Sequence, residues 1–224
     1  MGVIPAEVVK RILADLRTTK AILIRGKDSI LAGDPQNDID IFVPKLTWNS
    51  SPSFGNNTIM SLRRFGSDQI KVLVKESASD LVVEIDIFHK LTWRGIQMAD
   101  VESLPAHQVD ELGIYCLDKN AEVWLTVLKN VLHGSATPGE KLIGVTGTPS
   151  FLSAGKFKML SHRLNRKLVY YAWQASRKKL PSYRDVFFAR LTLIIIRAIE
   201  EPGMTANSVV RWFTWRIFQG SLRK

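Results

Sequence analysis

The chain has 224 residues, of which 46% are hydrophobic, enough to bury a core and to exclude a disordered tail. Its single cysteine excludes an internal disulfide, and no Cys/His spacing is typical of a zinc site. The amino terminus lacks a signal-peptide pattern, and no apolar run approaches the roughly 20 residues of a membrane-spanning helix. We therefore expect a cytoplasmic protein without a transmembrane segment.

The net charge of +10 is concentrated at one end of the sequence. Residues 1–150 hold 16 Lys and Arg against 18 Asp and Glu, whereas residues 151–224 hold 15 against 3. Clustered cationic side chains attract nucleic acid, an anionic membrane surface or an acidic protein. Composition leaves these three kinds of partner open.

The first half of the sequence predicts an α/β (α+β) arrangement with a mixed sheet. Apolar residues recur at helical spacing over residues 5–18. A short strand, a glycine turn, a short helix and a second strand are then expected between residues 21 and 43, and a polar loop covers residues 48–58. Further strands are predicted over residues 62–65, 70–75 and 81–88.

The second half predicts helices. Asp118 is placed to cap a helix over residues 121–133, and the Gly-, Thr-, Ser- and Pro-rich stretch 134–155 is typical of a linker. Three basic helices are expected over residues 156–177, 183–200 and 206–220. We therefore divide the chain into an α/β domain, 1–117, and a basic α-helical domain, 118–224.

Carboxylates occur at two of the predicted strands. Asp38 and Asp40 are two residues apart and share a strand face, between apolar neighbours that face the other way. Asp86 lies in a later strand and is the expected third member, with Glu84 on the same face as the alternative. Like charges held this close favour a bound cation, and carboxylate oxygens suit Mg²⁺ or Mn²⁺. Two such ions support in-line displacement at a nucleoside triphosphate.

With the turn at Gly26, these residues resemble the nucleotidyltransferase superfamily, which includes DNA polymerase beta and the tRNA CCA-adding enzymes. The resemblance covers residues 20–90: a glycine turn, an Asp-x-Asp strand about ten residues later and a lone carboxylate in a following strand. Lys27 stands where a small residue is usual, and Ser29 is the alternative phosphate contact. Segments 90–96 and 128–134 also resemble uncharacterised bacterial members found with polysaccharide-synthesis functions.

The resemblance implies transfer of a nucleoside monophosphate to a hydroxyl acceptor, with substrate between the two domains. The acceptor is open among an RNA end, a sugar and a protein. Asp38, Asp40 and Asp86 are the expected catalytic residues and metal ligands. The expected nucleotide contacts are Arg25, Gly26, Lys27, Ser29 and Lys129.

Other charged residues have two interpretations each. His133 shares a helix face with Lys129, where the pair either contacts triphosphate or faces solvent. Arg63 and Arg64 either steer phosphate or belong to a charged strand edge. The nearby residues His89 and Arg94 follow the Asp86 strand.

The aromatic and basic tail, residues 190–216, either binds nucleobases or lipid, or forms a helical core with its arginines in water. Two rival functions follow from this tail: a noncatalytic nucleic-acid-binding or scaffold protein, and a protein that docks on an anionic membrane surface.

Overall fold

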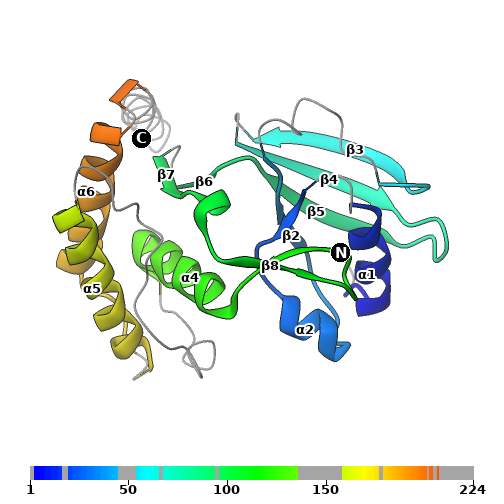
Figure 1. The fold of residues 1–224 in the computed structure, drawn as a ribbon, viewed down its shortest axis with the longest axis horizontal. Coiled ribbons are helices and arrows are strands. Elements are labelled where there is room, and N and C mark those ends of the chain that lie inside the picture. The colour runs from blue at the N-terminus through cyan, green and yellow to red at the C-terminus, as the bar shows by residue number, and fades with distance from the viewer. Residues whose placement is uncertain are drawn as a thin grey trace, which may run out of the picture. The chain divides into compact units, whose positions relative to one another are not determined.

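The computed structural model describes residues 3–16, 20–44, 54–65, 68–93, 96–135, 158–176, 179–200, 202–203 and 206. The chain forms two compact units: a first unit of Met1–Lys90 and Val101–Asp118, and a second unit of Leu91–Asp100 and Lys119–Lys224. Figure 1 shows the elements of both. Most of the expected loop 48–58, nearly all of the expected linker 134–155, and the expected helix 206–220 apart from Ala206 lie outside the described residues.

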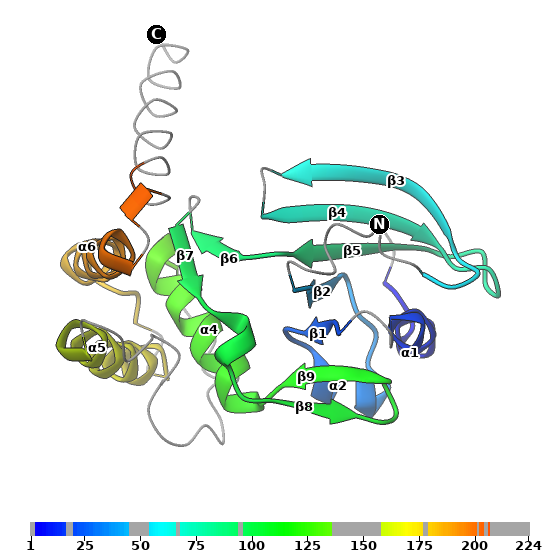
Figure 2. The same cartoon turned by 45° about the horizontal axis from the view of Figure 1, so that its top comes forward.

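The first unit is built on a seven-stranded mixed sheet with the strand order β3-β4-β5-β2-β1-β9-β8. Strands β2 and β5 are parallel, as are β1 and β9, and the other neighbours are antiparallel. Figure 2 shows β3, β4 and β5 running side by side. The elements are α1 (Ala6–Asp15), β1 (Ile22–Leu23), α2 (Lys27–Ala32), β2 (Ile39–Phe42), β3 (Thr58–Phe65), β4 (Gln69–Lys75), β5 (Val82–Phe88), η2 (Val101–Ser103), β8 (Ala106–Val109) and β9 (Ile114–Leu117).

One face of this sheet carries the hydrophobic core. Helix α1 buries Val9, Ile12 and Leu13 at helical spacing, and they join one cluster with alternate residues of β2, β4 and β5. Ile41 of β2 and Ile85 of β5 belong to this cluster and are fully buried. Because side chains alternate along a strand, the residues between these isoleucines point to the other face.

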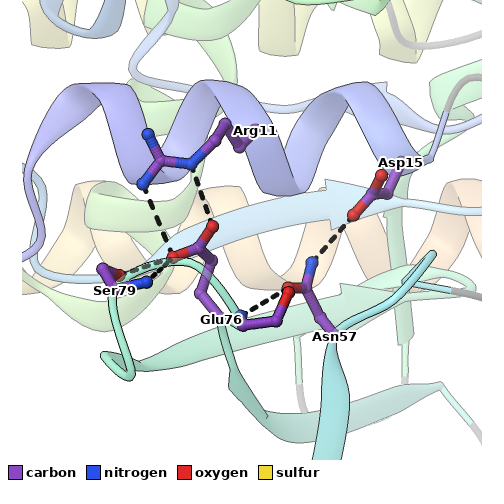
Figure 3. A network of polar contacts seen from close by, with 6 residues as sticks. Arg11, Asp15, Asn57, Glu76 and Ser79 are labelled. Atoms are coloured by element: carbon purple, nitrogen blue, oxygen red, sulfur yellow. Dashed lines mark hydrogen bonds and ion pairs between the residues drawn. The ribbon is translucent and has the colours of Figure 1, made fainter.

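A polar network ties α1 to the hairpin of β4 and β5 (Figure 3). Glu76, only 3% exposed, accepts hydrogen bonds from Arg11 Nε at 2.9 Å and from Ser79 N at 2.7 Å. The Arg11 hydrogen bond, and then that of Ser79, lowers the pKa of Glu76 to about 2. Asn57 Nδ2 donates to Asp15 at 2.8 Å, at the other end of the helix face. The network therefore fixes α1 on the sheet.

The second unit consists of helices and one hairpin. Three helices pack against one another: α4 (Lys119–His133), α5 (Lys158–Ser176) and α6 (Tyr183–Glu200). The hairpin consists of β6 (Leu91–Trp93) and β7 (Ile96–Ala99), which pair antiparallel, and β7 contacts α4 and α6. Arg190 Nε donates to Leu132 O at 2.9 Å, and Arg197 Nε donates to Gln97 O at 2.8 Å. These two arginines hold the unit together, whereas the sequence interpretation assigned them to solvent or a ligand.

The expected mixed α/β chain with a mixed sheet is confirmed. Strands β6 to β9 were not predicted, because each has only three or four residues and such segments carry little alternation. Strand β3 begins at Thr58, before the expected start at residue 62, since this edge strand is exposed and lacks a buried face there. Across the described part of the chain, no helix has both the length and the apolar character needed to cross a membrane.

Candidate metal centre

The pairing of β2 with β5 places two aspartates side by side. The strands are parallel, and Asp40 is the register partner of Asp86, flanked by the pairs Ile39 with Ile85 and Ile41 with Ile87. The isoleucines enter the core, so both carboxylates lie on the opposite sheet face. Two aspartates that are 46 residues apart in the sequence thereby become neighbours.

Asp38 completes the group from the residue just before β2. One carboxylate oxygen from each of Asp38, Asp40 and Asp86 lies within 4.8 Å of the others. The Asp40 side chain is 9% exposed, that of Asp86 13% and that of Asp38 36%, so the group is partly open to solvent. The structure therefore brings together all three predicted ligands.

Arg25 pairs with both of the first two carboxylates. Its Nη2 donates to Asp38 Oδ2 at 2.9 Å, and its Nε forms an ion pair with Asp40. The backbone N–H of Ile24 donates to Asp40 O at 3.0 Å, which aligns the segment before Gly26 with β2. This alignment explains why Arg25 reaches both aspartates.

Strand β4 supplies the partners of Asp86. Lys71 is its register partner, and Lys71 Nζ lies 3.8 Å from Asp86 Oδ1 and forms an ion pair with Glu84. Gln69 Nε2 donates to Asp86 Oδ1 at 3.2 Å. Glu84, the alternative third ligand, is thus engaged by Lys71. The sequence interpretation missed Lys71 and Gln69, because strand register is not visible in a single sequence.

Burial raises the pKa of the Asp86 carboxyl, although Lys71 and Gln69 lower it in part; Glu84 and Asp38 add repulsion that raises it further. The four carboxylates of Asp38, Asp40, Glu84 and Asp86 share two cationic side chains, so the ionised group has a formal charge of −2. A negative group of oxygen donors is suited to a hard divalent cation.

The glycine turn lies directly after Arg25. Gly26 has φ of +87°, in the left-handed region that favours glycine, and α2 begins at the next residue. Lys27 Nζ lies 3.4 Å from His107 Nε2 of β8, and His107 Nδ1 lies 2.7 Å from Asp118 Oδ1. Ser29 is within α2 and partly exposed. The predicted turn residues thus lie close together in one turn and the start of α2, and Arg25 among them pairs with the carboxylates.

The remaining candidate residues have different surroundings. Lys129 and His133 are exposed on α4, in the second unit. Arg63 is exposed on β3 and is the register partner of Lys71, whereas His89 Nδ1 lies 3.5 Å from Val43 O. Arg94 and the side chain of Arg64 lie outside what the structure describes.

Comparison of the chain with models of known protein families, with curated proteins and with solved structures gave no match.

Proposed function

We propose that the first unit is a divalent-metal-dependent nucleotidyltransferase, which moves a nucleoside monophosphate from a nucleoside triphosphate to a hydroxyl acceptor. The observation that carries the proposal is the gathering of Asp38, Asp40 and Asp86 oxygens within 4.8 Å, from two adjacent parallel strands. The order of β1, the Gly26 turn, α2, the Asp-x-Asp strand and β5 agrees with the order that the sequence resemblance implies.

The donor set fits Mg²⁺ or Mn²⁺. All three proposed ligands are carboxylates, which these hard cations prefer, and with Glu84 and the cations Arg25 and Lys71 included the group has a formal charge of −2 that attracts a divalent ion. Asp38, Asp40 and Asp86 would hold the ions, and the bound ions supply Lewis-acid activation of the phosphate and of the acceptor hydroxyl.

The protein side chains have distinct proposed roles. Asp86 completes the proposed metal site from β5 and is proposed to help to deprotonate the acceptor hydroxyl. Arg25 and the backbone of the turn from Gly26 to Ser29 bind the triphosphate, with Lys27 beside it.

The test is calorimetric titration of ATP, CTP, GTP and UTP in the presence of Mg²⁺. We expect metal-dependent binding of at least one triphosphate to the native chain, and a loss of at least about tenfold in affinity in Asp40→Asn and Asp86→Asn, since metal sites depend on each ligand. Asp34→Asn is the matched control, because Asp34 is an exposed carboxylate in the turn after α2.

A triphosphate that binds is then supplied with RNA, sugar and protein acceptors, and release of pyrophosphate is measured. Absence of binding by all four triphosphates contradicts the proposal. Equal weakening by Asp34→Asn and Asp40→Asn also contradicts it, because the effect would then not depend on the carboxylate group.

A further inference from the structure

Exposed aromatic side chains gather on α5 and α6 of the second unit. Tyr170 is 41% exposed and Trp173 50%, whereas Leu168 and Tyr171 of the same helix are buried. Phe187 of α6 is 56% exposed. Large apolar side chains grouped at a surface are typical of an interaction site.

These aromatic rings stand beside cationic side chains at a pocket. A pocket of about 580 Å³ is lined by Arg166, Lys167, Tyr170, Asp185 and Phe188. Lys167 Nζ lies 5.5 Å from the Tyr170 ring centroid and 6.0 Å from that of Phe188. The Tyr170 and Trp173 rings are stacked, with centroids 6.0 Å apart and planes at 25°. Lys167, Tyr170 and Phe188 thus line one pocket, and the Trp173 ring stacks on Tyr170 at this surface.

The charge of the pocket is effectively positive. Asp185, its acidic lining residue, accepts a 2.6 Å hydrogen bond from Ser182 Oγ at the start of α6, so it has a structural role. Among the side chains that the structure describes, Arg166, Lys167 and Arg184 are exposed cations of α5 and α6, whereas Arg190 and Arg197 donate to backbone carbonyls within the unit. The surrounding sequence, residues 151–224, carries +12.

We propose that this surface, defined by Arg166, Lys167, Tyr170, Trp173 and Phe188, binds a single-stranded polynucleotide. Proteins that bind single strands combine cations along the phosphate backbone with aromatic rings on which bases stack, and this surface offers both. Arg166 and Lys167 lie among these aromatic residues, whereas a helix that lies in a membrane interface presents a continuous apolar face, so the surface favours a strand. The inference is independent of the nucleotidyl centre, which belongs to the first unit.

The test uses the full chain and fluorescence anisotropy of labelled single-stranded RNA and DNA oligonucleotides of about 16 nucleotides. Tyr170→Ala/Trp173→Ala is expected to weaken binding about tenfold or more at every salt concentration, because stacking is lost. Lys167→Ala is expected to weaken binding and to reduce the slope of log affinity against log salt by about one, because one phosphate contact is lost.

Matched controls come from the first unit: Tyr115→Ala, since Tyr115 is 45% exposed on β9, and Lys75→Ala, since Lys75 is 43% exposed on β4. Neither is expected to change the affinity. Tyr170→Leu keeps an apolar side chain without the ring, so weaker binding in this variant attributes the loss to stacking and not to misfolding, which circular dichroism monitors.

Two results overturn the inference. One is an oligonucleotide affinity that is the same in Tyr170→Ala/Trp173→Ala and the native chain. The other is that no oligonucleotide binds, while the chain sediments with phosphatidylserine vesicles and loses this sedimentation in Tyr170→Ala/Trp173→Ala. That result would assign the surface to a membrane. Equal affinity for RNA and DNA supports the inference, and a preference between them names the natural strand.

Discussion

At the scale of single residues, Arg25 binds the same carboxylates that are proposed to bind a metal ion. Its guanidinium pairs with Asp38 and Asp40 together, so it reduces the repulsion between two carboxylates that share one site. As a proposed phosphate contact, it also lies between the metal ligands and the glycine turn. Removal of the Arg25 charge is therefore expected to change the affinity for the metal and the affinity for the nucleotide in opposite directions.

We expect Arg25→Gln to bind Mn²⁺ about three- to tenfold more tightly without nucleotide, because one competing positive charge is removed. The same variant should bind the metal-bound triphosphate more weakly. Calorimetry of both titrations measures this, with Arg184→Gln as a control at an exposed position of α6 in the second unit. Unchanged Mn²⁺ affinity in Arg25→Gln would show that the guanidinium does not compete with the metal.

Glu76 gives the first unit a defined pH dependence. Its pKa is lowered from 4.5 to about 2, chiefly by the Arg11 hydrogen bond (Figure 3). A lowered pKa in the folded state stabilises the fold above about pH 4.5, and this stabilisation is lost as the pH falls from about 4.5 to about 2.

Glu76→Gln is therefore expected to lower the free energy of unfolding by about 1–2 kcal/mol at neutral pH, with a difference from the native chain that shrinks below about pH 4.5. Urea unfolding at several pH values measures it. Glu7→Gln, at an exposed ion pair of the same helix, should leave stability unchanged. A difference that stays the same between about pH 4.5 and about pH 2 contradicts this account.

At the scale of elements, two glycines with the same backbone conformation frame α2. Gly26 precedes the helix and Gly33 follows it, each with φ of +87°. A Cβ at Gly26 would lie 3.2 Å from Gln36 Oε1, whereas a Cβ at Gly33 meets nothing within 4 Å.

Gly26→Ala and Gly33→Ala are each expected to lower stability by about 1–2 kcal/mol, because alanine is strained in the left-handed region. Only Gly26→Ala should also weaken triphosphate binding, since Gly26 adjoins Arg25. Chemical unfolding of both variants measures the loss of stability caused by backbone strain, and calorimetry measures the affinity for the triphosphate. Equal triphosphate affinity in the two variants would remove the turn from the proposed site.

Arg197 joins two elements of the second unit. It is 6% exposed on α6 and donates to the Gln97 carbonyl of β7. Arg197→Ala leaves that carbonyl without this donor and is expected to lower stability by about 2–3 kcal/mol in chemical unfolding. Arg184→Ala, at an exposed position of the same helix, should change it by less than about 0.5 kcal/mol. Similar losses in both variants would contradict a structural role specific to Arg197.

The sequence predicted the bounds of some helices closely but did not predict several short strands. Helix α6 has the predicted bounds of residues 183–200, and α4 differs from its prediction only in beginning two residues earlier. Helices are formed by local hydrogen bonds, so a periodic sequence is sufficient to find them. Strand β1 has two residues and depends on β2 and β9 for its hydrogen bonds, so its existence depends on distant segments.

At the scale of the whole molecule, the proposed nucleotide site and the proposed polynucleotide surface belong to different compact units. A variant in one proposed site should therefore leave binding at the other site unchanged. We expect Asp40→Asn to abolish triphosphate binding and to retain oligonucleotide affinity, and Tyr170→Ala/Trp173→Ala to do the reverse. Hydrogen exchange should show protection of β2 and β5 by the metal-bound triphosphate, and of α5 and α6 by the oligonucleotide. Loss of both activities in either variant contradicts two separate sites.

The sequence by itself predicted which side chains are candidates for the proposed site. Asp38 and Asp40 are two residues apart, and the two-residue period of a strand predicts that they share a face. Only the tertiary structure decided that β5 pairs parallel with β2 and in the register that joins Asp86 to Asp40. It also decided that Arg25, Lys71 and Gln69 surround the group. The physical reason is that strand pairing is set by burial and hydrogen bonding between segments far apart in the sequence, which local periodicity does not record.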